Sequence, residues 1–412
     1  MKNGTMGSWG LGRFVVALGT LSLGLLVTGC QPECVDRYDC ASKGSPGEGK
    51  QYACVDGRCV PQDVPGATDA GTDAGTEPTD AGTDACANVP HDPKLGTLQL
   101  QTGFAAAETA TLPEGIGAVT AVPSGSEFKL YGLRDTDIHA LGTWPNVALG
   151  AARLQSIYAE ADRDGGTRYP NGYLTNDGTR LLAGYTKPGP VTSIPGTVLV
   201  YDTVTPGNSK YLAANGNYTA AGFDGGFVIT GQGIEGSNES GNAVYALKTS
   251  TSSFQGSKLA NFPPAGLYSG FTAVATNGVA VLGFSDSSFA NHLRAVAPAT
   301  YTPALSSGTP FTMNDTNAPE VYAGADLKSV TGFGEGVALH RGTFTTTSDI
   351  SRFELTLGGI TPTSVTVGER KAVLTVGNTC TDVVLMAPMG PDLLVGVKDK
   401  NGRRLVRLQV QP

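Results

Sequence analysis

The sequence is poor in charged and aromatic residues: of 412 residues, 16% are Asp, Glu, Lys or Arg, and 7% are aromatic. Basic residues form no cluster longer than the region around Arg403 and Arg404, and the net charge is -8. Nucleic-acid binding, which needs a basic face, is therefore not expected. Long amphipathic segments rich in Ala, Leu, Glu and Lys are also missing from most of the chain, which argues against a helical protein.

Histidine is scarce as well, and the four histidines do not lie within metal-ligand spacing of one another; they are His91, His139, His292 and His340. We therefore expect neither a metal centre nor a cofactor. One stretch leaves an alternative open. The run from Asp162 to Gly165 begins like a calcium loop but lacks the distal glutamate, so a loosely bound structural calcium ion stays open there.

Glycine and proline, by contrast, are abundant, with 57 Gly and 25 Pro. This balance predicts many turns and many short strands. The strongest turn signals recur at spacings of 53, 47, 53, 56 and 56 residues, at Gly125, Gly178, Gly225, Gly278, Gly334 and Gly390. A period of about 50 residues suits a four-stranded blade. The pattern predicts an all-β fold over residues 94–412, a six-bladed β-propeller, with seven blades as the alternative count.

Each predicted turn is followed by an apolar run that we assign as the second strand of its blade; these runs are 127–132, 180–186, 227–231, 279–284, 337–340 and 393–398. A third set follows at 137–141, 197–203, 242–249, 292–296, 349–356 and 404–410. The sixth blade then lacks a strand, and the alternating segment 96–102 is expected to supply it. A β-sandwich is the competing fold, but its strands usually recur every 8 to 12 residues or so.

The runs V-L-V-Y-D-T and A-V-Y-A-L-K-T place an aromatic residue in an apolar strand that ends at a polar residue. They resemble the blades of quinoprotein-like and related propellers. This resemblance concerns architecture and covers roughly residues 95–412.

The N-terminal 29 residues combine a basic start, an apolar run from Phe14 to Val27, and the ending Val-Thr-Gly before Cys30. An apolar run this short suits a secretory signal better than a membrane span of about 20 residues. The ending resembles the lipobox of bacterial lipoproteins, which implies cleavage before Cys30 and lipidation of its thiol. An ordinary signal peptide is the alternative. In some bacteria an Asp just after the lipidated cysteine retains a lipoprotein in the inner membrane. No Asp follows Cys30, so an outer-membrane location, surface-exposed or facing the periplasm, is expected.

Removing Cys30 from the seven cysteines leaves six, which can all pair in an oxidising compartment. Four of the six fall within 26 residues and predict a small disulfide module over residues 30–62, held by Cys34, Cys40, Cys54 and Cys59. A zinc site is the alternative for these four. The module resembles small cysteine-rich modules of predicted lipoproteins from myxobacteria. Cys86 and Cys380 remain, and we expect them to be bonded to each other.

Residues 63–93 are rich in Thr, Asp, Ala and Gly, and their central part has no large apolar residue. Such a composition cannot offset the entropy of ordering. We expect a disordered linker between the module and the propeller.

Two motifs resemble catalytic or cofactor sequences. The run Gly231 to Gly236 matches G-x-G-x-x-G, but no helix is expected after it, so we interpret it as a blade loop. Ser126 and Lys129 match S-x-x-K inside a hairpin without its companion motifs. The loops between strands are otherwise rich in Ser, Thr, Gly, Asn and Pro, which suits adaptable contacts better than catalysis.

The sequence thus favours a lipid-anchored envelope protein whose propeller is a binding or assembly platform for a protein or glycan partner. A propeller enzyme, such as a sugar dehydrogenase or lyase with its site at the channel mouth, is the first alternative. A purely structural envelope protein is the second.

Overall fold

The structure, a computed structural model, describes residues 50–55, 58–63, 86, 88–157, 172–185, 197–215, 219–223, 225–237, 241–249, 254–342, 349–358, 363–376 and 378–411. Contacts divide the chain into two units, residues 1–80 and 81–412. The predicted signal segment, Cys30, Cys34, Cys40, most of the predicted linker and the Asp162 loop lie outside the described residues.

In the first unit, the described residues form one antiparallel hairpin of β1 (Lys50–Val55) and β2 (Arg58–Asp63). The register places Cys54 opposite Cys59. Cys59 takes part in a disulfide.

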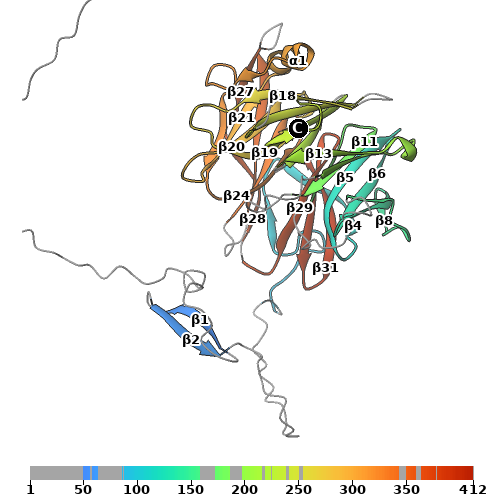
Figure 1. Ribbon diagram of the computed structural model, residues 1–412. Coiled ribbons are helices and arrows are strands. Elements are labelled where there is room, and N and C mark those ends of the chain that lie inside the picture. Colours follow the sequence, from blue (N-terminus) through green and yellow to red (C-terminus); the bar gives the residue numbers. More distant parts are fainter. Residues whose placement is uncertain are drawn as a thin grey trace, which may run out of the picture. The chain divides into compact units, whose positions relative to one another are not determined.

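The second unit is a β-propeller of six blades, in which all strand pairs but one are antiparallel (Figure 1). Blade 1 contains β5 (Ile116–Ser124), β6 (Glu127–Arg134), β7 (Asp137–Thr143), β8 (Asn146–Val147) and β9 (Gln155–Ser156). Blade 2 contains β10 (Gly172–Asn176), β11 (Arg180–Tyr185), β12 (Thr197–Asp202), β13 (Lys210–Asn215) and β16 (Gly233–Ile234), with the short 3-10 helix η3 (Pro206–Asn208) between β12 and β13. Blade 3 contains β14 (Thr219–Phe223), β15 (Gly226–Gly231), β17 (Ala243–Thr249), β18 (Phe254–Asn261) and β22 (Phe311–Thr312).

Blade 4 contains β19 (Tyr268–Val274), β20 (Ala280–Ser285), β21 (Asn291–Val296) and β23 (Glu320–Gly324). Blade 5 contains β24 (Leu327–Gly332), β25 (Gly336–Arg341), β26 (Asp349–Gly358), β27 (Ser364–Val367), β28 (Lys371–Val376) and β3 (Leu98–Leu100). Blade 6 contains β29 (Asp382–Met389), β30 (Asp392–Asp399), β31 (Gly402–Val410) and β4 (Phe104–Thr111).

The six glycine turns predicted from the sequence each join the first strand of a blade to its second. All six glycines have a positive φ, between 59° and 94°. Glycine adopts this left-handed backbone without the steric cost that a Cβ atom brings, which is why glycine marks these turns. The predicted second and third strands therefore fall where expected, and the six-bladed propeller is confirmed.

The core consists of one apolar layer between each pair of neighbouring blades. Second strands supply both of the layers that flank their blade, because successive side chains point to opposite faces. In β30, for example, Leu393 and Val395 pack toward blade 5, whereas Leu394 packs toward blade 1. β15 and β20 are buried at every position for the same reason. No layer can form without its two blades, so closure of the ring completes the core.

Closure differs from the sequence-based expectation by one blade. The segment predicted to complete the sixth blade forms β3, and β3 pairs with β28 at the outer edge of blade 5. β4, which the sequence analysis did not identify, completes blade 6 by pairing with β31. Its sequence, F-A-A-A-E-T-A-T, is rich in alanine, a residue depleted in strands, so propensity gave no signal. The N-terminal segment thus supplies outer strands to two consecutive blades.

Cys86 and Cys380 are bonded, as the sequence predicted. Cys380 lies in the connection between β28 of blade 5 and β29, the first strand of blade 6. The bond therefore fastens the start of the N-terminal segment to the point where these two blades meet. The last residues of the predicted linker also belong to this unit, since the His91 Nδ1 atom lies 2.9 Å from the Asp399 Oδ2 atom.

Among the residues that the structure describes, one α-helix interrupts the strands. α1 (Pro298–Ser307) lies in the connection between β21 and β23, begins with proline and ends at Gly308, which has a φ of 69°. Proline at the first turn and a left-handed glycine after the last are the usual helix boundaries. The sequence analysis expected no helix here. Downstream of α1, β22 crosses to blade 3 and pairs with β18, so blade 4 contributes a strand to its neighbour.

Candidate functional site

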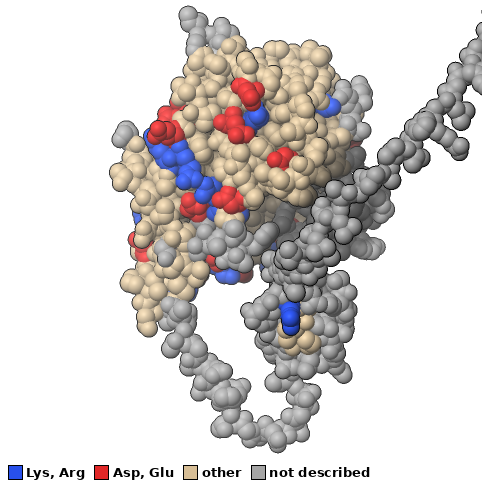
Figure 2. Space-filling view, turned by 90° about the vertical axis from the view of Figure 1, so that its left-hand side faces the viewer, with Lys and Arg blue, Asp and Glu red and all other residues tan. Residues whose placement is uncertain are grey.

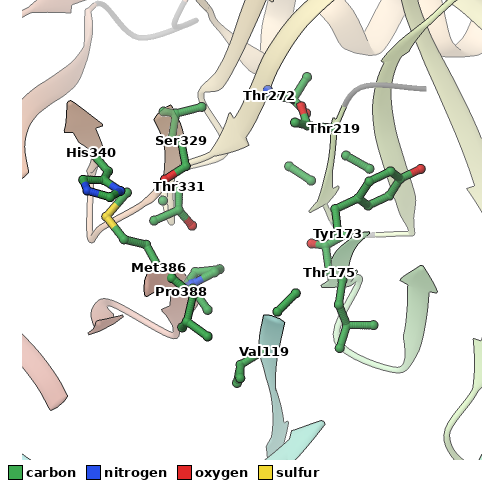
Figure 3. A pocket seen from close by; sticks show the side chains of 18 of the residues that line it. Val119, Tyr173, Thr175, Thr219, Thr272, Ser329, Thr331, His340, Met386 and Pro388 are labelled. Carbon is green, nitrogen blue, oxygen red and sulfur yellow. Dashed lines mark hydrogen bonds between the residues drawn. The ribbon is translucent and has the colours of Figure 1, made fainter. Parts of the chain in front are cut away.

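A cavity of about 440 Å³ lies on the propeller axis, where the first strands of all six blades meet (Figure 3). Every first strand contributes to it: β5, β10, β14, β19, β24 and β29. These strands can approach closely because glycines occur where neighbouring blades touch. A Cβ atom on Gly222 would lie 1.6 Å from the carbonyl oxygen of Asn176, and one on Gly332 would lie 2.2 Å from that of Val274. The width of the cavity therefore depends on these glycines.

The cavity wall mixes apolar side chains with hydroxyl groups. Its hydroxyl-bearing residues are Tyr173, Thr175, Thr219, Thr272, Ser329 and Thr331. Figure 3 shows the hydroxyls of Thr175, Ser329 and Thr331 directed into the open space. Among the described residues of the wall, Lys328, His340 and Tyr173 are the ones that ionise, and none is a carboxylate.

Several of these polar groups also join one blade to the next. The Asn176 side-chain amide donates to the Thr120 hydroxyl at 2.6 Å, and the Gly222 amide donates to the Thr175 hydroxyl at 3.2 Å. The hydroxyls of Thr219 and Thr272 lie 2.9 Å apart. These bonds run between blades 1 and 2, 2 and 3, and 3 and 4, so the inner ring is held by directional contacts as well as by the apolar layers.

His340 is the one buried imidazole of the wall. It lies on β25, the second strand of blade 5, and is 6% exposed. Its Nε2 atom is buried and has no hydrogen-bond partner. Burial, together with the positive charge of Lys328, lowers the pKa of His340 to about 4, so the ring is neutral at pH 7. Met386 lies beside it (Figure 3).

A second opening, of about 610 Å³, shares Asn176, Gly222, Val274 and Pro388 with the cavity, and therefore lies on the same axis. Three of the turn glycines line it, Gly178, Gly278 and Gly390, and α1 contributes Tyr301 and Leu305 to its wall. Its carboxylate, Asp177, is occupied by the turn that it caps: one oxygen accepts from the Arg180 amide at 2.7 Å, and the other from the Thr249 hydroxyl at 2.7 Å.

The opposite face, where the first strands begin, carries an exposed apolar group on blade 4. We call Leu267, Tyr268 and Phe289 the aromatic shelf; they are 45%, 40% and 69% exposed. The rings of Tyr268 and Phe289 are stacked, with centroids 5.5 Å apart and planes 12° apart. Phe289 has a φ of 61°, which is unfavourable for a residue with a Cβ atom.

Phe289 is held in this conformation by Asp286. One Asp286 oxygen accepts from the Ser288 hydroxyl at 2.7 Å, from the Ser288 amide at 2.8 Å and from the Ala290 amide at 3.1 Å. The Ser288 hydroxyl is the main reason that the pKa of Asp286 is lowered to about 2, and His292 adds to the effect. The turn that presents the shelf is therefore fixed by a carboxylate that stays ionised at neutral pH.

The four histidines lie apart in the structure. His91 bonds to Asp399, and His340 lines the cavity. His139 lies on β7, with a buried Nδ1 atom that has no partner. His292 lies between two carboxylates, with Nδ1 2.9 Å from Glu320 and Nε2 3.3 Å from Asp286, and its ring stacks on Phe284. The parts of the chain that the structure describes contain no group of three or more metal-ligating side chains.

Charged side chains on the surface gather in small groups of both signs (Figure 2). One such group joins Arg341 to Asp326 and Asp349 at 3.5 and 3.8 Å, with the Arg341 guanidinium over the ring of Tyr322. The Tyr322 hydroxyl donates to Asp326. Burial is the main reason that the pKa of Tyr322 rises to about 12, so this tyrosine stays protonated and bonded.

The two motifs with catalytic resemblance form ordinary blade structure. Gly231 ends β15, the chain passes through β16, and the next element is β17, a strand. Ser126 and Lys129 belong to the hairpin of β5 and β6. Neither the cavity wall nor the shelf was identified from the sequence, because both join residues from distant segments. Exposed aromatic residues in the Tyr268 and Phe289 turns were the available signal for the shelf.

Within the described residues, no helix has the length and hydropathy needed to cross a membrane. No family model and no curated protein matches the chain. Solved structures with similar folds include the PQQ-bound aldose sugar dehydrogenase of Streptomyces coelicolor, at 12% identity and a TM-score of 0.40, covering 74% of this chain and 97% of that one. The β-propeller domain of Myceliophteria thermophila Cps50 (Swd1) is 10% identical with a TM-score of 0.40, and the match covers 74% of this chain and 100% of that one. The SapL1 lectin in complex with alpha methyl fucoside is 11% identical with a TM-score of 0.37, and the match covers 73% of this chain and 97% of that one. These likenesses concern the fold alone.

Proposed function

We propose that this protein is a lipid-anchored component of the cell envelope whose propeller acts as a binding platform for a protein or glycan partner. The aromatic shelf is the observation that carries the platform role. Large exposed apolar groups cost solvation free energy in the free protein, and a left-handed Phe adds roughly 1 kcal/mol of backbone strain. Both features lower the stability of the free protein, and a surface that binds a partner explains why they are present.

The shelf suits a partner because it is rigid and rimmed by polar groups. Asp286 and His292 lie beside it, and the Asn242 amide donates to the Leu267 carbonyl at 2.8 Å. Aromatic rings that need little ordering, surrounded by hydrogen-bonding groups, are typical of protein–protein contact surfaces, and an open ring face can also stack on a sugar. The anchor rests on the sequence alone, on the apolar run and the Val-Thr-Gly that precede Cys30.

The anchor is tested by Cys30→Ala. Cleavage and lipidation both need the thiol, so the variant is expected to lose partition into the detergent phase of a Triton X-114 extract, or to remain as the uncleaved precursor. Labelling with a radioactive fatty acid should fail in the variant and succeed in the natural chain. A processed variant that still enters the detergent phase would contradict the anchor and leave the platform untouched.

The platform is tested with a photoreactive phenylalanine at position 268 for protein partners and an oligosaccharide panel for glycans. Binding in either assay should be lost in Phe289→Ser. The matched control is Val204→Ser, because Val204 is 78% exposed but lies in the β12–β13 connection of blade 2. A partner that binds all three proteins equally would show that the shelf is not the recognition surface.

A further inference from the structure

We propose that the axial cavity binds a small uncharged ligand with several hydroxyl groups, a monosaccharide or a cyclic polyol. This site is separate from the platform surface, because it draws its residues from the first strands of all six blades, whereas the shelf belongs to blade 4. The cavity volume of about 440 Å³ falls within the roughly 300–1,000 Å³ of ordinary small-molecule sites.

Two buried polar side chains on the blade 5 side of the cavity carry the proposal. His340 and Thr331 are 6% and 8% exposed, and both line the cavity. The Nε2 atom of His340 has no hydrogen-bond partner, and the Thr331 hydroxyl, which is directed into the cavity (Figure 3), bonds to no other described residue. Folded proteins rarely leave such groups without a partner. A ligand that hydrogen-bonds to both supplies the partner that the fold does not.

Hydroxyl groups meet the cavity from opposite sides of the ring. Ser329 lies opposite His340 in the pairing of β24 with β25, and Thr175 of blade 2 faces the pair across the axis (Figure 3). The Thr175 oxygen accepts from the Gly222 amide at 3.2 Å, which leaves the hydroxyl hydrogen of Thr175 to donate into the cavity. A ligand that bonds to both sides needs polar groups on opposite edges, as the ring of a sugar or a cyclic polyol has.

Much of the remaining wall is apolar and includes Val119, Val274 and Met386. A wall of this kind, with a few convergent polar groups, orients a ligand through its polar edges and contacts the rest of it by apolar packing. The C–H faces of a sugar or cyclic polyol suit the apolar part of the wall, and the hydroxyls at its edge suit the polar part.

The charge of the wall favours an uncharged ligand over an ion. Lys328 is the one charged side chain among the described residues of the wall, but it is exposed to solvent and already takes part in another interaction. Burial, with a smaller contribution from Lys328, lowers the pKa of His340 to about 4, so the ring is neutral at pH 7. A charged ligand would therefore give up its hydration without gaining a counter-charge. An uncharged ligand avoids that cost.

The test uses the full chain, with D-glucose and myo-inositol as probes. The ring C–H signals of the four histidines are followed by NMR at pH 7, and the signal that is missing from His340→Gln is that of His340. At least one probe is expected to shift this signal with a Kd in the millimolar range, while the signals of His91, His139 and His292 stay in place. If about 50 mM of either probe left the His340 signal unmoved, the cavity would hold solvent only and the site would be overturned.

Two matched compounds test the chemical class. D-glucuronate has the ring of glucose with a carboxylate, and it should bind about tenfold or more weakly because its charge finds no partner. Cyclohexanol keeps a six-membered ring with one hydroxyl, and it should bind about tenfold or more weakly because most of the hydrogen bonds are lost. Equal binding of glucuronate would overturn the uncharged assignment, and equal binding of cyclohexanol would overturn the polyol assignment.

A pair of threonine variants tests the contact with the wall. Thr331→Val keeps the shape of the side chain and removes its hydroxyl, so it should weaken binding of the probe about threefold to tenfold. Thr109→Val is the matched control, because Thr109 is exposed on β4, the outer strand of blade 6. Unchanged signals of the other three histidines show that a variant is folded. Full binding by Thr331→Val would overturn the assignment of Thr331 as a ligand contact.

Discussion

We call the contacts that close the ring, Asp399 with Arg404 and His91 together with the Cys86–Cys380 disulfide, the seam. The seam and the aromatic shelf on blade 4 differ in whether their side chains are paired. At the seam, Asp399 receives both arms of Arg404, at 2.9 and 2.8 Å, and also the ring of His91. On the shelf, Phe289 is exposed and lies in an unfavourable backbone region. The seam therefore adds stability where the ring could open, and the shelf gives up stability where a partner could bind.

The largest effect is expected from the disulfide of the seam. Cys86 and Cys380 are 294 residues apart, so their bond removes much of the entropy of the unfolded chain, as much as about 5 kcal/mol in the chain-entropy model. The double variant Cys86→Ser with Cys380→Ser should lower the midpoint of chemical unfolding accordingly. Cys59→Ser is the matched control, because Cys59 belongs to the other unit and the propeller transition should not move. An unchanged midpoint in the double variant would show that pairing of β3 and β4 alone closes the ring.

Next comes the buried ion pair of the seam. Asp399→Asn leaves Arg404 without its counter-charge, and breaking a buried pair from one side costs about 3–5 kcal/mol. Burial acts to raise the pKa of Asp399, but hydrogen bonds from Arg404 and His91 outweigh it and hold the pKa well below the usual 3.8. The stabilisation is therefore complete above about pH 4 and is lost as the pH falls below that value. Unfolding free energies measured from pH 6 to pH 2 should show this loss in the natural chain and a flatter profile in the variant. Asp315→Asn, at an exposed carboxylate, is the control.

These two regions also show what the sequence could predict. The turn glycines are local signals, since a positive φ and a short turn depend on few residues, and they located all six blades. The pairing of Cys86 with Cys380 followed from counting cysteines. The strand register at the seam did not follow, because β3 and β4 are adjacent in sequence and either could pair with β31. Only packing between blades decides that choice.

The sites were harder to predict for the same reason. The shelf depends on Tyr268 and Phe289 meeting across two connections of blade 4, and the cavity depends on six strands spread over about 270 residues, from Gly117 to Pro388. The residues next to His340 in the sequence do not indicate that it is buried. Its low pKa comes from burial and from Lys328 on the adjacent strand, which only the folded ring brings together.

His340 gives a third, smaller effect, in a different pH range from that of the seam. Burial and Lys328 lower its pKa from 6.5 to about 4. Between these two pH values the imidazole is protonated in the unfolded chain and neutral in the folded protein. Stability is complete above about pH 6.5 and declines as the pH falls toward 4, by roughly 3 kcal/mol at most. His340→Gln should remove this slope while leaving the loss below pH 4 that Asp399 causes. A slope between pH 6.5 and 4 that persists in His340→Gln would assign it to another group.

The smallest effect on stability, and the sharpest contrast with the seam, is expected from Phe289→Asn. Asparagine tolerates the left-handed backbone better than phenylalanine, which should return up to about 1 kcal/mol. Losing the stack on Tyr268 takes away about 0.5–1 kcal/mol, so the two changes nearly cancel. The free energy of unfolding should therefore stay within about 1 kcal/mol of that of the natural chain, while partner binding is lost. Leu282→Ala is the control on the same blade: Leu282 is 0% exposed, and shortening it should destabilise the core without touching the shelf. If Phe289→Asn destabilised the protein as much as Asp399→Asn does, the shelf would be a structural element like the seam, and the exposed rings would serve the fold.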